Sequence, residues 1–262
     1  MLNILFIPEI ILSIGVMIII LFDLFFQKQK GLSFTLVQFL LLIAAYYSLN
    51  NKFSPSYSAY TLNEFTNVFK FILLVGSFAI FHYTYKHLKF LKILKIEYFT
   101  ISLLGLIGTM IMISANSLLM LYLGIELLSL SLYALIGFNK KSSLSSEAAI
   151  KYYVLGAMSS GILLFGISLI YGFTGSIGYD DIASQLINID INSVDYIAII
   201  FGIIFITASL CFKFGAAPFH MWVPDIYQGS LISTTILLST LPKIAVFIVF
   251  LKLYFIPFIL LR

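Results

Sequence analysis

Charge and cysteine are scarce in this sequence. Only 10% of the 262 residues are charged and 61% are hydrophobic, whereas soluble domains carry roughly 25% charged residues. The one cysteine, Cys211, lies inside an apolar run, so no disulfide or cysteine-ligated metal cluster can form within the chain. Arginine occurs only at Arg262, and the lysines lie in short loops without forming a patch, which argues against nucleic-acid binding.

Several motifs of soluble and redox enzymes are also missing. The sequence has no glycine-rich phosphate loop, no cysteine set for iron–sulfur ligation and no histidine pair placed for haem. We therefore expect no redox centre, no cofactor and no metal in this chain. An enzyme with its own membrane active site is disfavoured, because no nucleophile–base or metal constellation is present.

Apolar stretches recur along the whole sequence instead. They indicate an all-α membrane protein, because backbone groups in hydrocarbon must bond within their own segment. The first run is too long for a signal-peptide core and has no basic flank, so it is interpreted as a retained span, with membrane lipids around it. We expect about eight transmembrane helices, at residues 4–26, 33–49, 65–85, 98–115, 118–138, 148–172, 196–228 with an interruption at 215–218, and 232–257.

Loop charges predict the orientation of these spans. Basic residues gather in the loops after the first, third and fifth spans, whereas the loops after the second, fourth and sixth contain only Lys52. The positive-inside rule then places the N-terminus on the side opposite to the cytoplasm or matrix. The lysines that set this orientation are Lys28, Lys30, Lys86, Lys89, Lys92, Lys95, Lys140 and Lys141.

The segment FKFGAAPFHMWVPDIYQGSLISTTILLSTLPK is the most informative part of the chain. It begins at Phe212 and ends with Lys243, and it places Lys213 and Lys243 among apolar residues. A lysine deep in hydrocarbon costs several kcal/mol and is therefore a functional-site hypothesis by default. Gly215 and Pro218 predict a broken helix, which is tolerated where it lines a wet cavity or is buried in protein. We interpret the two lysines as stations on a proton path.

Glu126 lies halfway along the fifth predicted span. It is either protonated or hydrogen-bonded in place, for example to Ser129, or it is a carboxylate paired with Lys213. Burial lowers the proton affinity of a lysine and a nearby carboxylate raises it, so relative movement of such a pair would switch the lysine between holding and releasing a proton. Lys243 directly follows Pro242, which is expected to bend the last span beside the ammonium.

The remaining candidates have two readings each. Glu147 and Lys151 are spaced for a helical ion pair, as a surface pair or as a site of proton uptake. His220 is either a relay or a structural histidine. Trp222 is interpreted as an interface anchor or packing group, and Asp225 as a surface residue that caps or pairs. Glu9, Asp23 and Lys70 are assigned to snorkelling or capping near span ends.

These residues lie in blocks that resemble a known family. GIELLSLSLYALIGF, SSEAAIKYYVLGAMSSGILLFGISLIYGFTGS, FKFGAAPFHMWVPDIYQGS and LPKIA are similar to the antiporter-like membrane-arm subunits of respiratory complex I, the family of NADH dehydrogenase subunit 2. The start, PEIILSIGVMIIILFDLF, is also similar, so the resemblance extends over nearly the whole chain. It implies an antiporter-like fold, in which Glu126 pairs with Lys213, Lys243 is the central lysine of the last span, and Lys151 with Glu147 belongs to the uptake region.

The resemblance also implies a domain organisation and partners. Residues 1–96 would form three N-terminal helices, and residues 97–262 would form one five-helix half-channel repeat. Family members carry a second inverted repeat that this sequence does not contain, so we expect a separate chain or another complex I subunit to supply it. Other membrane-arm subunits are the expected partners. The composition is typical of AT-rich organelle genes, which favours the mitochondrial inner membrane over a bacterial plasma membrane.

Three functions remain open at this point. The first is a proton-translocating, non-redox subunit of NADH:ubiquinone oxidoreductase that uses the lysine and glutamate relay. The second is a subunit of a cation/proton antiporter, which shares the repeat. The third is a structural remnant retained for assembly after loss of pumping.

Overall fold

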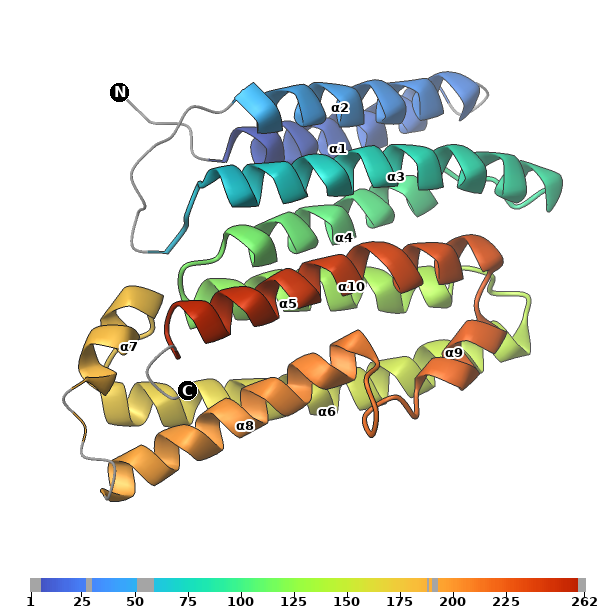
Figure 1. Cartoon of the computed structure of the whole chain (residues 1–262). Coiled ribbons are helices and arrows are strands. Elements are labelled where there is room, and N and C mark those ends of the chain that lie inside the picture. The colour runs from blue at the N-terminus through green and yellow to red at the C-terminus, as the bar shows by residue number, and fades with distance from the viewer. Residues whose placement is uncertain (1–5, 27–29, 51–58, 188, 190–192, 259–262) are drawn as a thin grey trace.

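A bundle of long helices makes up the structure, a computed structural model that describes residues 6–26, 30–50, 59–187, 189 and 193–258 (Figure 1). The predictions for Lys28, Lys52, Arg262 and residues 4–5 lie outside these ranges. Eight helices are long and apolar enough to cross a membrane, which confirms the predicted fold class. They are α1 (Ile7–Phe25), α2 (Lys30–Asn50), α3 (Glu64–Phe90), α4 (Glu97–Ser114), α5 (Leu118–Ile136), α6 (Ser143–Thr174), α8 (Val194–Phe214) and α10 (Ile232–Phe255).

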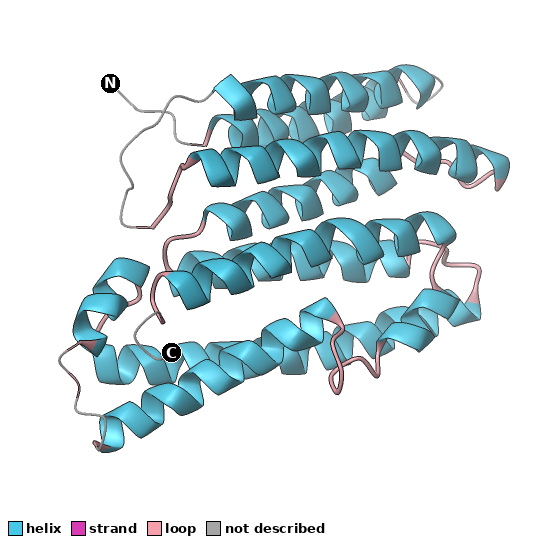
Figure 2. Ribbon diagram, viewed as in Figure 1, coloured by secondary structure: helices cyan, strands magenta, loops and turns pink. Residues whose placement is uncertain are grey.

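The described part of the chain also contains two short helices. Figure 2 shows that this part consists of helices joined by loops. α9 (Val223–Gly229) follows the break after α8 and matches the predicted second half of the seventh span. α7 (Tyr179–Leu186) lies after α6, in a stretch that was predicted to be a polar loop without a helix. α6 begins five residues earlier than predicted, because the Ser142 side chain accepts a hydrogen bond from the Ser145 backbone and caps the helix.

Glycine allows two helix pairs to approach closely. A Cβ at Gly108 in α4 would lie 2.8 Å from the Gly124 carbonyl oxygen in α5. A Cβ at Gly166 in α6 would likewise lie 2.6 Å from the Gly202 carbonyl oxygen in α8. Close backbone approach at small residues is the usual way that helices associate in membranes, where lipid offers no hydrophobic drive. These contacts fix α5 against α4 and α8 against α6, and so fix the helices that carry the candidate site.

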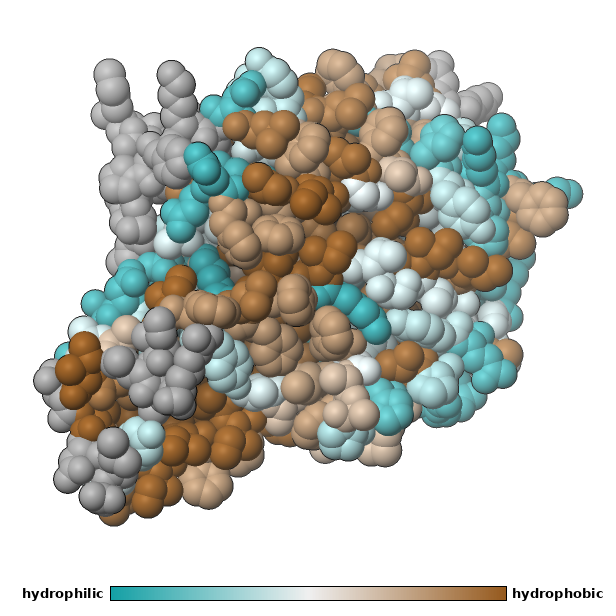
Figure 3. Space-filling model, viewed as in Figure 1, coloured by the Kyte–Doolittle hydropathy of each residue, from teal (hydrophilic) through white to brown (hydrophobic). Residues whose placement is uncertain are grey.

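α10 connects the two halves of the bundle. It packs against α3 and α4 on one side and against α8 on the other. It continues as a helix through Pro242, so the proline does not end it. Figure 3 shows apolar side chains over the middle of one face and hydrophilic ones toward the end where α9 lies, as expected for a chain that crosses a membrane.

Candidate functional site

The break after α8 forms the centre of the candidate site. Gly215 has φ of 75°, in the left-handed region that suits glycine at a helix C-terminus. The backbone N–H groups of Gly215 and Ala216 both donate to the Cys211 carbonyl, at 2.9 and 3.0 Å. The predicted break is therefore present, but Gly215 ends the helix and Pro218 lies in the turn beyond it.

Lys213 lies in the last turn of α8 and is buried. Its Nζ donates a hydrogen bond of 2.7 Å to the Ser129 hydroxyl on α5. That hydroxyl donates in turn to the Ile125 carbonyl at 2.7 Å. A cation at the C-terminal end of a helix is also stabilised by the helix dipole. The ammonium is thus held at the helix end by a neutral acceptor.

Glu126 is half-buried on α5, one helical turn from Ser129. The structure differs from the predicted direct ion pair, because no Glu126 oxygen lies within 4.0 Å of the Lys213 ammonium among the described residues. The carboxylate still interacts electrostatically with Lys213, and its Oε1 is buried without a hydrogen-bond partner. Ser129, rather than Glu126, accepts the hydrogen bond from Lys213, because Ser129 lies one turn further along the same face of α5.

Lys243 reaches the same helix end from α10. Its Nζ would lie 3.6 Å from a Cβ on Gly215, two residues after Lys213. It lies over the rings of Phe214 and Tyr227, at 5.8 and 6.0 Å from their centroids, which is cation–π geometry. No described carboxylate or hydroxyl holds it. The structure therefore places both predicted lysines at the break.

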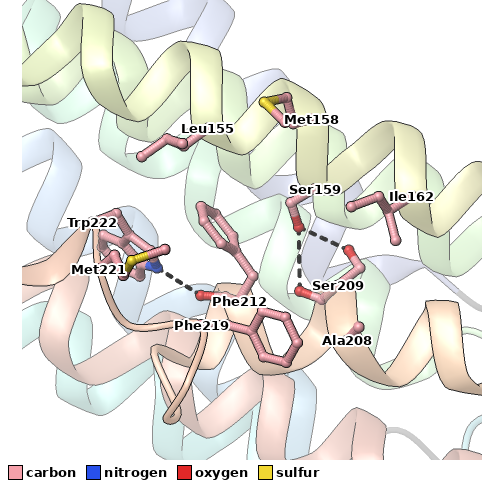
Figure 4. Close-up of a pocket in the computed structure, with 10 residues that line it drawn as sticks. All are labelled: Leu155, Met158, Ser159, Ile162, Ala208, Ser209, Phe212, Phe219, Met221 and Trp222. Atoms are coloured by element: carbon pink, nitrogen blue, oxygen red, sulfur yellow. Dashed lines mark hydrogen bonds between the residues drawn. The ribbon is translucent and has the colours of Figure 1, made fainter.

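Trp222 fixes the turn that closes the break (Figure 4). Its indole Nε1 donates to the Phe212 carbonyl at 2.8 Å, and its ring lies 5.0 Å from that of Tyr152 on α6. The side chain is 1% exposed, so it is the packing group of the two alternatives. Beside it lies a cavity of about 170 Å³, lined mostly by apolar groups of α6, α8 and the turn. Ser159 and Ser209 in its wall bond to each other at 2.9 Å.

The predicted pair of Glu147 and Lys151 is present in α6, with the two charged groups 2.8 Å apart. Lys151 also bonds to Asp225 of α9 at 2.8 Å, a pairing that was not predicted from the sequence. All three side chains are exposed, at the end of the molecule where α6 begins (Figure 1). The trio therefore ties α9 to α6 and is open to solvent.

His220 is exposed in the turn between α8 and α9. No hydrogen bond or ion pair joins it to Lys213 or Lys243 in the described structure. Tyr227 of α9 is better placed, because its ring faces Lys243 and its hydroxyl is buried without a partner. The phenol can both donate and accept a hydrogen bond at this position. One tyrosine among many gives no sequence signal for this position.

The assignment of Glu9 and Lys70 to snorkelling or capping is wrong. Their side chains are 5% and 0% exposed and form an ion pair of 2.6 Å between α1 and α3. They lie near helix ends, but Tyr60, just before α3, covers them. Lys252 of α10 is also buried, although its position in the sequence does not predict this. A charged residue near a helix end is usually exposed, so the sequence does not predict that it is buried by a neighbouring segment.

The assembled site gathers several ionisable and hydrogen-bonding groups. Lys213, Lys243, Glu126 and the neutral hydroxyl of Tyr227 are ionisable or hydrogen-bonding groups around one helix break. Within the described residues, no group of three His, Cys, Asp or Glu side chains is placed to hold a metal ion. Two lysines beside a broken helix define a membrane transporter-like site, since transporters use broken helices at the sites where ions bind.

Comparison with known proteins gives the family. Residues 115–260 match the sequence model of the family described as NADH:quinone oxidoreductase/Mrp antiporter, TM. The chain belongs to this family. It is 42% identical over 245 residues to NADH-quinone oxidoreductase subunit N of Ruthia magnifica subsp. Calyptogena magnifica, covering 92% of this chain and 51% of that protein. It is 37% identical over 256 residues to the protein of that name from Pelagibacter ubique strain HTCC1062, covering 96% and 53%.

Solved structures agree with the fold. A chain of respiratory complex I from Thermus thermophilus, solved with bound aureothin, superposes with a TM-score of 0.75 at 25% identity. The match covers 94% of this chain and 52% of that one. The chain thus spans about half the length of the relatives that it matches.

Proposed function

We propose that this chain is a proton-translocating part of a membrane-arm subunit of NADH:quinone oxidoreductase, respiratory complex I, and that it carries no redox centre itself. One observation carries the proposal: the buried ammonium of Lys213 and the ammonium of Lys243 both lie at the end of the interrupted helix α8, where Lys213 contacts Ser129 and Lys243 lies beside Gly215. The similarity to proteins named NADH-quinone oxidoreductase subunit N supports the assignment of the enzyme complex.

The proposed relay moves one proton between the two lysines. Lys213 holds the proton while its ammonium donates to Ser129 and feels the charge of Glu126. When Glu126 is protonated or moves away, the ammonium loses stabilisation and releases its proton toward Lys243. Tyr227 lies beside Lys243 and can accept a hydrogen bond from it or donate to its amine form. Glu147 and Lys151, with Asp225, would supply protons from the aqueous end. His220 would exchange protons at the surface of the turn.

The placement in the membrane is also a proposal. The basic loops would face the cytoplasm or matrix, and the N-terminus would face the opposite side. Composition favours the mitochondrial inner membrane, whereas the bacterial relatives favour a plasma membrane. Residues 1–96 would act as an N-terminal three-helix unit and residues 97–262 as a half-channel repeat.

The partners in this proposal are other membrane-arm subunits of the complex. The relatives' remaining half would supply the second repeat, in this polypeptide or in a separate one. Mass spectrometry of the complex purified in mild detergent identifies that polypeptide. A purified complex that lacks any chain with the second repeat would contradict this part of the proposal.

The experiment is the variant Lys213→Met in the assembled complex. We expect assembly at normal levels and at least a tenfold loss of NADH-driven proton uptake into sealed membrane vesicles. Lys140→Met is the matched control, because Lys140 is exposed in the loop after α5. Unchanged proton uptake with Lys213→Met would refute the proposal and favour a structural remnant.

A cation/proton antiporter is the second candidate, because the description of the matched family includes the Mrp antiporter. The same vesicles separate the two functions. Proton movement driven by a sodium or potassium gradient without NADH would favour the antiporter. Proton uptake that requires NADH and quinone favours the complex I subunit.

A further inference from the structure

A second group of buried charges lies at the end of the molecule opposite to the Lys151 trio. Glu9 of α1 and Lys70 of α3 form an ion pair of 2.6 Å. Tyr60 donates to the same carboxylate oxygen, Glu9 Oε1, at 2.6 Å, and the Lys70 ammonium donates to the Tyr60 hydroxyl. The other oxygen, Glu9 Oε2, is buried and has no hydrogen-bond partner. Two donors, the Lys70 ammonium and the Tyr60 hydroxyl, thus share Glu9 Oε1, while Glu9 Oε2 stays free to take a proton.

Stability alone is a weak reason for such a triad. Replacing both members of a buried ion pair with apolar groups is often neutral or stabilising, because desolvation offsets the attraction. The triad also joins α1 to α3 and to the residues just before α3, since Glu9 lies in α1, Tyr60 shortly before α3 and Lys70 within α3. Each segment therefore contributes one proton-binding group to a single buried point.

Tyr60 acts as a hydrogen-bond donor that keeps its own proton in this arrangement. Burial and the adjacent Glu9 carboxylate raise the pKa of Tyr60 well above its usual range. The phenol therefore keeps its proton at physiological pH and orients the carboxylate, rather than exchanging the proton. Direct transfer is left to Lys70 and Glu9, whose nitrogen and oxygen are within hydrogen-bond distance.

Lys252 extends this group toward α10. Its Nζ donates to the Thr61 hydroxyl at 2.6 Å and to the carbonyls of Ile113 and Ala115 at 3.0 and 2.7 Å. Thr61 directly follows Tyr60, and the Lys252 charge interacts with those of Lys70 and Asp180. The ammonium is therefore held against the C-terminal end of α4, close enough for its charge to act on Lys70.

α10 connects this group to the break. Lys243 and Lys252 are nine residues apart on one continuous helix, which corresponds to about 13 Å along the axis and to opposite faces. One ammonium faces Phe214 and Tyr227, and the other faces the end of α4. Ionisable groups of the described chain therefore lie at both ends of the molecule and between them. They are the exposed Lys151 trio at one end, the lysines at the break, and the Glu9 group where α1 begins.

We propose that Glu9, Tyr60 and Lys70 form a proton-exit site at the end of the molecule where α1 begins. The charge of the Lys252 ammonium repels the Lys70 proton. The Lys70 N–H bond then breaks as a Glu9 O–H bond forms, which leaves a neutral amine and a neutral acid. Glu9 releases its proton to the adjoining aqueous side, the Lys70 amine takes a proton from Lys252, and a proton from the relay restores the Lys252 ammonium. One proton is moved and no electron is transferred.

This inference rests on the proposed function, so its test uses the same complex and vesicles. The decisive variant is the double substitution Glu9→Gln with Lys70→Met, which removes both charges. We expect normal assembly, because no unpaired buried charge remains, and at least a fivefold loss of NADH-driven proton uptake. Each single substitution is expected to assemble less well. Double-variant complexes with unaltered proton uptake would overturn the proton-exit role and leave a structural ion pair.

Tyr60→Phe is a second test of the proton-exit site, and Lys30→Met is its control. Tyr60→Phe keeps the ion pair, so it assembles even if the double variant does not, and we expect proton uptake to fall severalfold. Uptake equal to that of the unmodified complex would also refute the proposal. Lys30→Met is the control, because Lys30 is exposed and bonds only to the Leu94 carbonyl.

The two proposals fail separately in these experiments. If Lys213→Met abolishes proton uptake while the double and Tyr60→Phe variants do not, the exit site is wrong and the proposed function stands. If Lys213→Met has no effect, the proposed function itself fails. An infrared difference spectrum during turnover gives an independent readout, with the carbonyl band of a protonated acid that Glu9→Gln removes. A spectrum without that band in the unmodified complex would contradict the transfer to Glu9.

Discussion

The Lys213 ammonium donates to the Ser129 hydroxyl at 2.7 Å and not to the carboxylate of Glu126. A hydroxyl accepts a hydrogen bond from the ammonium without adding a negative charge. The lysine therefore binds its proton less strongly than it would in an ion pair. Glu126 acts from further away on the same helix. Its charge can therefore tune the lysine without a large movement of the helix.

Ser129→Ala is expected to remove the hydrogen bond from Lys213 to the Ser129 hydroxyl. The buried ammonium loses its only described hydrogen-bond acceptor, and an unsatisfied buried group costs about 1–3 kcal/mol. We expect NADH-driven proton uptake to fall by about tenfold with normal assembly. Ser131→Ala is the control, because Ser131 on the same helix bonds only to the Leu127 carbonyl. Equal uptake in the two variants would show that the Ser129 contact has no functional role.

The double variant Glu147→Gln with Asp225→Asn tests the exposed trio. Both carboxylates lie 2.8 Å from Lys151, but all three side chains are exposed, so the unfolding temperature is expected to change little. Proton uptake should slow severalfold, because the carboxylates that gather protons at this end are gone. Vesicle assays over a range of pH measure the effect. A drop in unfolding temperature with unaltered uptake would instead assign the trio to holding α9.

Trp222→Phe is expected to loosen the turn after the break. It removes the indole donor to the Phe212 carbonyl, worth about 1 kcal/mol, and part of the ring packing against Tyr152. Limited proteolysis should cut the turn faster, and proton uptake should fall with it. Met221→Ala is the neighbouring control, since Met221 is 82% exposed. If both variants are cut at the unmodified rate, Trp222 does not hold the turn.

Gly166→Ala tests the close approach of α6 and α8. A Cβ there would lie 2.6 Å from a backbone oxygen, so the helices must separate, at a cost of about 1–3 kcal/mol. We expect a lower unfolding temperature in mild detergent. Gly161→Ala on the same helix is the control, because a Cβ at Gly161 would have no neighbour within 4 Å. Matching melting curves for the two would exclude a packing role for Gly166.

Most of the fold was predictable from hydropathy. Each span is a long apolar stretch, and the glycine at position 215 marks the break, because only glycine readily adopts its positive φ. Helix ends shifted by several residues where a capping serine lay among polar residues, as at Ser142. α7 was missed because it is short and polar, and neither feature separates a surface helix from a loop.

The candidate site was predictable only in its residue types. Lys213 and Lys243 stood out because lysine is costly in an apolar run. Their neighbours did not stand out: Ser129, Tyr227 and Asp225 are ordinary residues until the helices that carry them are placed together. Glu9 and Lys70 are near span ends in the sequence, and only the segment bearing Tyr60 turns them into a buried pair.

The sequence alone determined that the described part of the chain forms eight helices long and apolar enough to cross a membrane, with a break after one of them, because hydropathy and backbone hydrogen bonding are local properties. Tertiary structure decided which ionisable groups meet. Contacts between α5, α8 and α10 depend on how helices pack across the whole bundle, and no local pattern encodes which face of a helix meets which neighbour.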